Sequence, residues 1–249
     1  MDVLPDDITP ATLCGFVGRN LIHEVNSAKS AGISLQERRK SFITEYAYNI
    51  GMLSINIGML STNLHSYVTK QLVRPMLESM FNMCAAIHQP TFVESKMKME
   101  CEKWLGVLRK QLNEAGQTQK TIDAIKTSIT SLSSALAKWK DDVNIQSSRN
   151  WTVREICDAG NCSEWYFEYQ TLCDHTHMAY SALDPFTKIT RGMLLHQATV
   201  IAAKTYCDYR EFLNPREKNN CLRDAEVLMS YVMRWMNDGT YEKLRWEQA

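Results

Sequence analysis

The sequence predicts an all-α protein: a multi-helix bundle from which an antiparallel helical hairpin protrudes. Glycine and proline are scarce, at 10 and 6 of 249 residues, which leaves little material for the turns of a β-rich fold. Apolar residues recur at spacings of three and four, and no segment alternates convincingly with a period of two. We therefore expect one helical domain over residues 1–249, with 91–145 as a helical-hairpin insertion and 240–249 as a tail.

The amino-acid composition argues against several classes of protein, among them membrane-spanning, secreted and disulfide-bonded proteins. Lys plus Arg equals Asp plus Glu at 28 each, so net charge does not indicate nucleic-acid binding, although a local basic patch remains compatible with it. No run approaches the roughly 18 apolar residues of a membrane span, and the acidic N-terminus lacks a signal-peptide core. Eight cysteines without a C-x-x-C pattern are typical of scattered thiols in a reducing compartment. We expect a cytoplasmic protein without membrane contact.

The first helix is predicted from Thr9–Pro10, an N-cap followed by proline at the first helical position, to about Ala31. It carries Arg19 and His23 four residues apart, on one helical face. This spacing resembles, but is shorter than, the Arg-x4-6-His motif of the HEPN ribonucleases. The alternative is an ordinary histidine on a helix surface.

A long helix is predicted next, opening with a capping-box pattern at 34–37. It contains the repeat NIGMLSI, NIGMLST, NLHSYVT, whose apolar seam is Ile50, Leu53, Ile57, Leu60, Leu64 and Tyr67. Gly51 and Gly58 predict close approach of another helix, because a glycine inside a helix costs about 1 kcal/mol relative to alanine. Asn49, Asn56 and Asn63 lie beside the seam. These heptad-patterned residues predict self-association as a homodimer or binding of a protein partner; the alternative is a central helix of the bundle.

Arg74 and Glu78 follow at a four-residue spacing among apolar neighbours, and Pro75 predicts a kink or the start of a new helix. A partly buried Arg–Glu pair is costly unless other polar groups complete it. This pair is therefore a candidate for a functional site.

The hairpin insertion is predicted as two helices joined at Gly116. A capping-box pattern at Thr91–Glu94 opens the first, and the second runs from about 118 to 143. The apolar face of the first helix is predicted as Met97, Cys101, Trp104, Leu105, Leu108 and Leu112. The charged residues of the hairpin predict a solvated face, and the hairpin itself is a candidate partner-binding arm.

The chain is organised around Ser163–Leu183, which is compatible with a single helix. Trp165, Tyr169, Cys173 and His177 recur every four residues, so they share one stripe, and apolar neighbours predict that it faces inward. A capping box at 152–155 precedes this helix, and two further helices are predicted after it, from about 186 to 212 and after Asn214–Glu217.

Three segments in this order resemble a family of uncharacterised, mostly bacterial helical proteins known only as a domain of unknown function. They are Arg74 with Glu78; Trp151-Thr-Val-Arg-Glu155; and Tyr169-Gln-Thr-Leu-Cys173 with His177, where the family pattern has Ser in place of Cys173. The resemblance covers roughly residues 45 to 185. It implies the helical fold, singles out Arg74, Glu78, Tyr169, Cys173 and His177, and associates the chain loosely with phage-defence and toxin-type genes.

Two functions stay open at this stage, so the sequence does not decide whether the protein is an enzyme. The first is a helical interaction protein of bacterial or phage origin, acting in phage defence or counter-defence by binding a protein partner. The alternative is a metal-independent nuclease or nucleotide-directed hydrolase of the toxin or defence type. In that enzyme His177 would transfer protons, Arg74 would hold a phosphate, Glu78 and Tyr169 would position these groups, and Cys173 is a candidate nucleophile.

The two functions make opposite structural predictions. An enzyme requires the polar side chains to converge at an open pocket, whereas an interaction protein requires a closed cluster and an exposed apolar patch. Metal binding by Asp174 and His177 is a competing chemistry that no H-E-x-x-H or C-x-x-C pattern supports. The sequence also lacks phosphate-binding glycine motifs, so we predict neither metal nor cofactor.

Overall fold

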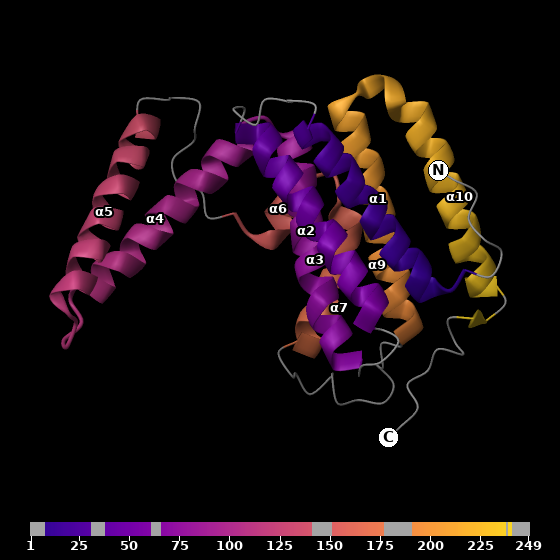
Figure 1. Ribbon diagram of the computed structural model, residues 1–249, viewed down its shortest axis with the longest axis horizontal. Coiled ribbons are helices and arrows are strands. Elements are labelled where there is room, and N and C mark those ends of the chain that lie inside the picture. Colours follow the sequence, from indigo (N-terminus) through magenta and orange to yellow (C-terminus); the bar gives the residue numbers. More distant parts are fainter. Residues whose placement is uncertain are drawn as a thin grey trace.

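Helices supply all the regular secondary structure in the part of the chain that the computed structural model describes, which is residues 8–30, 38–60, 66–140, 151–176, 191–237 and 239–240. They form a bundle from which a two-helix hairpin projects (Figure 1), so the predicted fold class is confirmed. No helix in these ranges has a stretch long and apolar enough to cross a membrane.

The bundle is built around α9, which lies against α1, α2, α3 and α10. Its main helices are α1 (Pro10–Ser30), α2 (Arg38–Leu60), α3 (Ser66–His88), α9 (Arg191–Leu213) and α10 (Lys218–Asn237). Leu194, Leu195 and Ile201 of α9 are fully buried. Leu194 and Ile201, two turns apart, share one face, and Leu195 is turned by about 100° from it, as expected for a helix with neighbours on several sides. Asn214 caps the short helix η3 (Pro215–Glu217) ahead of α10, its side chain accepting a hydrogen bond from the Arg216 amide.

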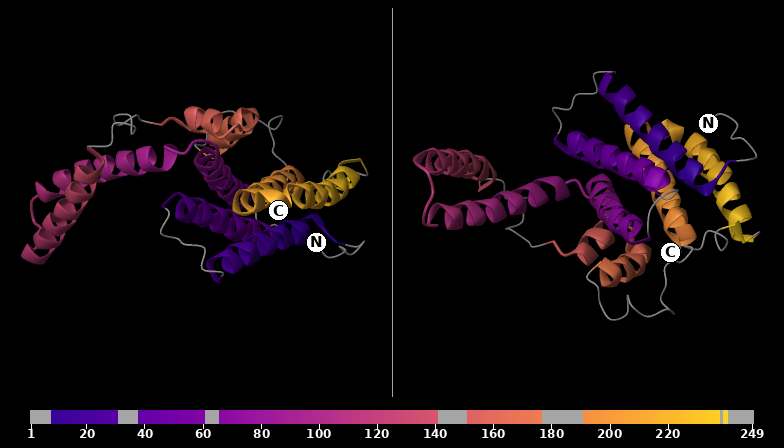
Figure 2. Two further views of the ribbon diagram at one scale, coloured as in Figure 1. Left: turned by 90° about the horizontal axis from the view of Figure 1, so that it is seen from above. Right: turned by 60° about the horizontal axis from the view of Figure 1, so that its bottom comes forward.

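Two short helices lie beside α3 and complete the part of the bundle that forms the candidate site. They are α6 (Val153–Ala159) and α7 (Tyr166–Thr176), with the single turn η1 (Ser163–Trp165) between them. Both pack on α3, as the views of Figure 2 show. The described part of the predicted 163–183 helix is thus a 3-10 turn followed by α7, and the remainder, including His177, lies outside the described residues.

α1 and α2 pack so closely that Gly18, Gly51 and Gly58 have no room for a side chain. A Cβ atom on Gly58 would lie 2.6 Å from the carbonyl oxygen of Ala11, and one on Gly18 would lie 2.7 Å from that of Gly51. The Ser54 hydroxyl donates a hydrogen bond of 2.6 Å to the Cys14 carbonyl across the same contact. The close approach predicted from the glycines of the repeat is confirmed, and the neighbouring helix is α1.

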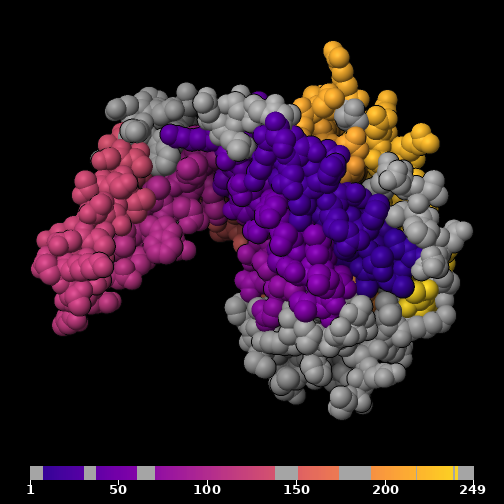
Figure 3. All heavy atoms as spheres, in the orientation of Figure 1, coloured from indigo at the N-terminus to yellow at the C-terminus, as the bar shows by residue number. Residues whose placement is uncertain are grey.

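The hairpin consists of α4 (Phe92–Leu112) and α5 (Gln119–Lys140). Its distal part stands away from the bundle (Figure 3). Between residues 104 and 136, all of which are described, only Leu105 and Ile125 are buried. Trp104 was predicted on the inner face, but this is wrong, because 56% of its surface is exposed. A helix with a single neighbour buries one narrow stripe, and Trp104 lies outside it.

Local details also differ from the sequence prediction. Thr91 has helical dihedral angles and makes no side-chain cap hydrogen bond, so the capping box predicted there is wrong. Pro75 does not start a new helix, because α3 continues through it. The capping box at Thr152 is confirmed, with its hydroxyl 3.3 Å from the Glu155 amide and the Glu155 carboxylate 3.0 Å from the Thr152 amide. The pattern at 34–37 lies outside the described residues.

All eight cysteines are free, as expected for scattered thiols. Most of them are buried in the bundle, where a thiol packs as a small apolar group. The cysteines therefore contribute to packing rather than to a disulfide framework.

The α1–α2 contact predicts that Gly58→Ala destabilises the protein. The added Cβ meets backbone atoms, which cannot move aside without separating the helices. We expect the free energy of unfolding to fall by about 1–3 kcal/mol in urea denaturation followed by circular dichroism. Gly106→Ala in α4 is the matched control: a Cβ there meets nothing within 4 Å, so stability should rise by up to about 1 kcal/mol. Equal effects of the two substitutions would contradict the close packing.

Candidate functional site

Arg74, Glu78 and Tyr169, three of the five predicted site residues, lie together where α7 packs on α3. The Arg74 Nε and the Tyr169 hydroxyl both donate to Oε1 of Glu78, at 3.1 and 3.0 Å. The Arg74 Nη2 lies 3.5 Å from the Tyr169 hydroxyl oxygen, and its guanidinium lies 5.6 Å from the centre of the Tyr169 ring. The four-residue spacing of Arg74 and Glu78 brings them to one face of α3, and Tyr169 completes the pair from α7.

The surroundings of Tyr169 keep its hydroxyl protonated. Burial, followed by the interactions with Cys173 and Glu78, raises the pKa of Tyr169 well above its ordinary value. Burial alone would lower the pKa of Arg74, but Tyr169, Cys173 and Glu78 raise it overall. At neutral pH the cluster therefore contains a guanidinium and a phenol that donates to a carboxylate. Tyr169 is suited to donating hydrogen bonds and cannot act as a base.

A cavity of about 310 Å³ opens beside this cluster. Its polar lining is Arg74, Glu78, Asn82, Lys96 and Tyr169, and its apolar lining is Phe81, Trp151, Val153 and Ile156. The Glu78 side chain is 40% exposed, so the cluster is open to solvent rather than closed. This volume is at the small end of the range typical for ligand sites, which are about 300–1,000 Å³.

Asn82 is a cavity residue that the sequence prediction missed. Its side-chain Nδ2 donates a hydrogen bond of 2.7 Å to the Glu78 carbonyl, which fixes the orientation of the amide. Its Oδ1 is buried without a hydrogen-bond partner, and only 9% of the residue is exposed. Buried acceptors are nearly always paired, so this oxygen is an exception; it is itself closed to solvent, although Asn82 lines the cavity. Asn82 lies four residues after Glu78, so the stripe that contains Arg74 and Glu78 could have revealed it.

Lys96 is the second missed residue, and it reaches the cavity from α4. Its side chain is 15% exposed, and its Nζ lies 3.9 Å from the Glu100 carboxylate. Burial lowers the pKa of Lys96, and nearby Lys103 lowers it further, against the opposing effects of Glu100 and Glu78. No motif connects Lys96 to Arg74 in the sequence, because the two meet only through the packing of α4 near α3.

Trp151 forms one wall of the cavity just before α6. Its indole Nε1 donates a hydrogen bond of 3.0 Å to Ser95, and its ring meets Phe92 edge-on at 5.1 Å. The next residue, Thr152, starts α6 with the capping box. The segment Trp151–Glu155 of the family resemblance thus supplies a cavity wall and a helix start.

Of the two remaining predicted site residues, the structure describes Cys173 but not His177. The Cys173 thiol is partly buried and interacts with the Tyr169 hydroxyl, so it belongs to the edge of the cluster. His177 lies outside the described residues, so its predicted role stays a prediction. The metal alternative included His177 and Asp174, whose side chain is not described; elsewhere, the described residues contain no group of three or more possible metal ligands.

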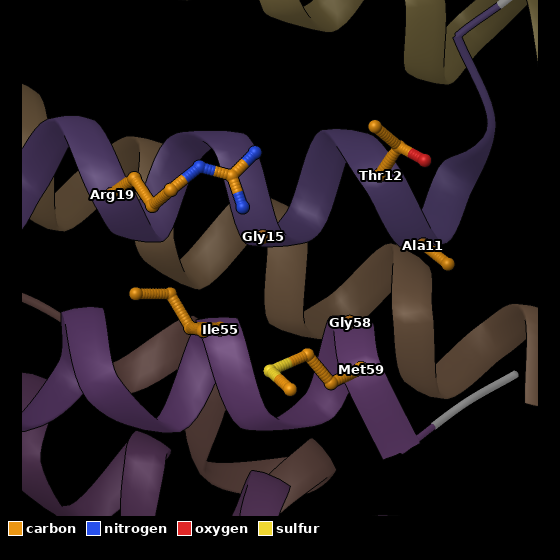
Figure 4. A pocket seen from close by; sticks show the side chains of 7 residues that line it. All are labelled: Ala11, Thr12, Gly15, Arg19, Ile55, Gly58 and Met59. Atoms are coloured by element: carbon orange, nitrogen blue, oxygen red, sulfur yellow. The ribbon is translucent and has the colours of Figure 1, made fainter. Parts of the chain in front are cut away.

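Arg19 lies in a different place from this cluster. It lines a smaller hollow of about 200 Å³ between α1 and α2, with Gly15, Gly58 and Met59 among its neighbours (Figure 4). A Cβ atom on Gly15 would lie 3.4 Å from its guanidinium, so the side chain lies over that glycine. His23 is exposed and is not part of this lining, so the hollow does not join Arg19 to His23.

The hydrogen bond of Tyr169 to Glu78 predicts a specific loss in Tyr169→Phe. Removing the hydroxyl leaves the carboxylate with one donor fewer, and we expect a loss of about 1 kcal/mol in the free energy of unfolding. Because the folded-state pKa of Tyr169 lies above its unfolded value of about 10, this stability is fully present below pH 10 and is lost as pH rises further. The stability difference between wild type and variant should therefore shrink above pH 10.

Tyr166→Phe serves as the control for that experiment. Tyr166 stacks beside Tyr169 on the same helix, at a ring distance of 6.2 Å. We expect a smaller stability change there than in Tyr169→Phe. Equal losses in the two variants, at all pH values, would contradict a special role for the Tyr169 hydroxyl.

Comparison with known proteins supports the family assignment. Residues 41–193 match the model of a family of unknown function, DUF5677, and this range spans more than half of the chain. It includes α3, α4, α5, α6 and α7, and every residue of the cavity lining falls within it. No curated protein and no solved structure matches the chain. The chain therefore belongs to the DUF5677 family of unknown function.

Proposed function

We propose that this protein binds a nucleotide-type phosphate ester in the cavity beside Arg74 and acts on it as a metal-independent nuclease or nucleotide-directed hydrolase. The observation that carries the proposal is the combination found in one open cavity. Two cationic side chains, Arg74 and Lys96, line it together with the hydrogen-bond donor Tyr169 and the aromatic side chain of Trp151. A ligand that pairs with both cations needs negative charge, and the phosphate groups of a nucleotide supply it.

The open cavity supports the enzyme function considered from the sequence. A polar cluster that serves only to stabilise the fold should be closed to solvent, because solvent exposure weakens the ion pair. An opening to solvent also leaves less apolar surface buried around the cluster. Here the Arg74–Glu78 pair borders a solvent-accessible space with aromatic walls. This geometry supports a working site.

The chemistry follows from the side chains that line the cavity. Arg74, held in place by Glu78 and Tyr169, presents a preorganised cation to a phosphate that gains negative charge in the transition state. Lys96 adds a second positive charge from α4. Trp151 offers apolar surface for a base. Proton transfer is the role predicted for His177 from the sequence.

Substitution of the two cations tests this proposal. Arg74→Lys retains the positive charge but loses the planar guanidinium with its paired N–H donors. Lys96→Gln removes the charge and retains most of the side-chain volume. We expect both to lower cleavage of an RNA oligonucleotide and of bis(p-nitrophenyl) phosphate by at least about a hundredfold. Melting temperatures should stay close to that of wild type, since both side chains border solvent.

Lys98→Gln is the matched control, because Lys98 is on the same helix but does not line the cavity. The toxin and phage-defence association of the family resemblance supplies a second readout, growth inhibition or phage protection in cells. If the Arg74 and Lys96 variants fold normally and keep both activity and phenotype, the cavity is not the working site.

Partner binding is the second candidate function, and α2 supplies the observation that favours it. Asn49, Met52, Asn56 and Met59 are all exposed and recur at three- and four-residue spacings, with 66% of Met59 exposed. This stripe is the solvent-facing side of the predicted heptad repeat. We propose that it is the surface for self-association or for a protein partner, in the phage-defence setting predicted above.

Light scattering coupled to gel filtration tests self-association. If α2 mediates a homodimer, Met52→Glu with Met59→Glu should return the molar mass to that of one chain, because buried charge opposes the contact. Met233→Glu, at an exposed methionine of α10, is the control and should leave the mass unchanged. A wild-type protein with the mass of a single chain at all concentrations would contradict the homodimer.

A further inference from the structure

Helix α4 connects the cavity to the hairpin. Its first turns place Lys96 in the cavity lining, and its remaining turns pack against α5. Lys96, Lys103 and Lys110 follow one another at seven-residue spacings, so they lie nearly on one line along the helix. Lys103 and Lys110 are exposed, and the line extends about 21 Å at the usual helical rise. Lys103 is also near enough to Lys96 to affect its pKa.

The hairpin has a charge that the zero net charge of the chain conceals. Residues 92–140 contain nine Lys or Arg against five Asp or Glu, whereas the rest of the chain contains 19 against 23. The hairpin is therefore basic and the remainder of the chain acidic. Because charges farther apart than about 10 Å are largely screened in salt, an anionic partner responds to the local excess rather than to the total.

Trp104 lies beside Lys103, and 56% of its surface is exposed. Exposed aromatic side chains between cations are the elements with which proteins bind single-stranded nucleic acid, since bases stack on them regardless of sequence.

We infer that α4 binds a single-stranded polynucleotide along this line and leads it into the cavity. Backbone phosphates lie against Lys103 and Lys110, one base stacks on Trp104, and the reacting phosphate reaches Arg74 and Lys96. This inference rests on the proposed function and specifies its substrate as a polymer rather than a free nucleotide. At about 3.4 Å per stacked nucleotide, the lysine line accommodates about six nucleotides.

Two probes of different length separate the hairpin from the cavity. A fluorescein-labelled single-stranded 12-mer spans both, whereas a dinucleotide reaches the cavity alone. In the full chain, Lys103→Gln with Lys110→Gln should weaken 12-mer binding by about tenfold and reduce the salt-dependence slope by about 1.4, for two phosphate contacts on a single strand. Trp104→Ala should weaken it by about tenfold as well. Dinucleotide binding should stay unchanged in all three substitutions.

The control removes the same charge from the other helix of the hairpin, as Lys120→Gln with Lys126→Gln, and should retain the 12-mer affinity. RNA and DNA 12-mers are compared to identify the sugar that is preferred.

Unchanged 12-mer affinity in the Lys103 and Lys110 variant overturns the inference. If Arg74→Lys still abolishes dinucleotide binding in that case, the proposed function stands. A changed molar mass of the Lys103 and Lys110 variant with unchanged 12-mer binding also overturns the inference, because the hairpin then mediates contact between copies of the chain. Wild-type binding of both probes by Arg74→Lys overturns the proposed function and this inference together.

Discussion

The hydrogen bond from Tyr169 to Glu78 is the contact on which the candidate site depends. It joins α7 to α3, and it converts an ion pair within one helix into a network between two helices. The phenol is buried, so its hydroxyl requires a partner, and Glu78 is the acceptor within reach. Arg74 is then held from two sides, by the carboxylate and by the phenol. A cation restrained in this way meets a ligand without first having to be ordered.

The bundle treats its polar groups in two different ways. Between α1 and α2, Ser54 and Cys14 bond to each other's backbone, and Gly18, Gly51 and Gly58 let the helix backbones approach closely. Beside α3, by contrast, Asn82 retains an unpaired buried acceptor and the helices leave a cavity.

The hairpin extends the site beyond the bundle. Because α4 starts at the cavity wall and ends in solvent, one rigid helix carries both Lys96 and the exposed charges beyond it. A helix of this kind holds distant groups at fixed spacing without any loop. The same geometry explains why the hairpin has so few buried residues: beyond the bundle, each helix has one neighbour, and the buried seam runs through Leu105 and Ile125.

The sequence by itself determined which residues share a helical face. Periodicity is a local property, so the pairing of Arg74 with Glu78, the inward position of Tyr169, and the close approach at Gly58 were all predictable. Only the tertiary structure decided which faces meet. Lys96 and Trp151 reach the cavity from segments with no spacing relation to Arg74, and Trp104 is exposed because α5 covers a different stripe of α4. Helical spacing specifies a direction around one axis, whereas a site depends on how several axes are placed relative to one another.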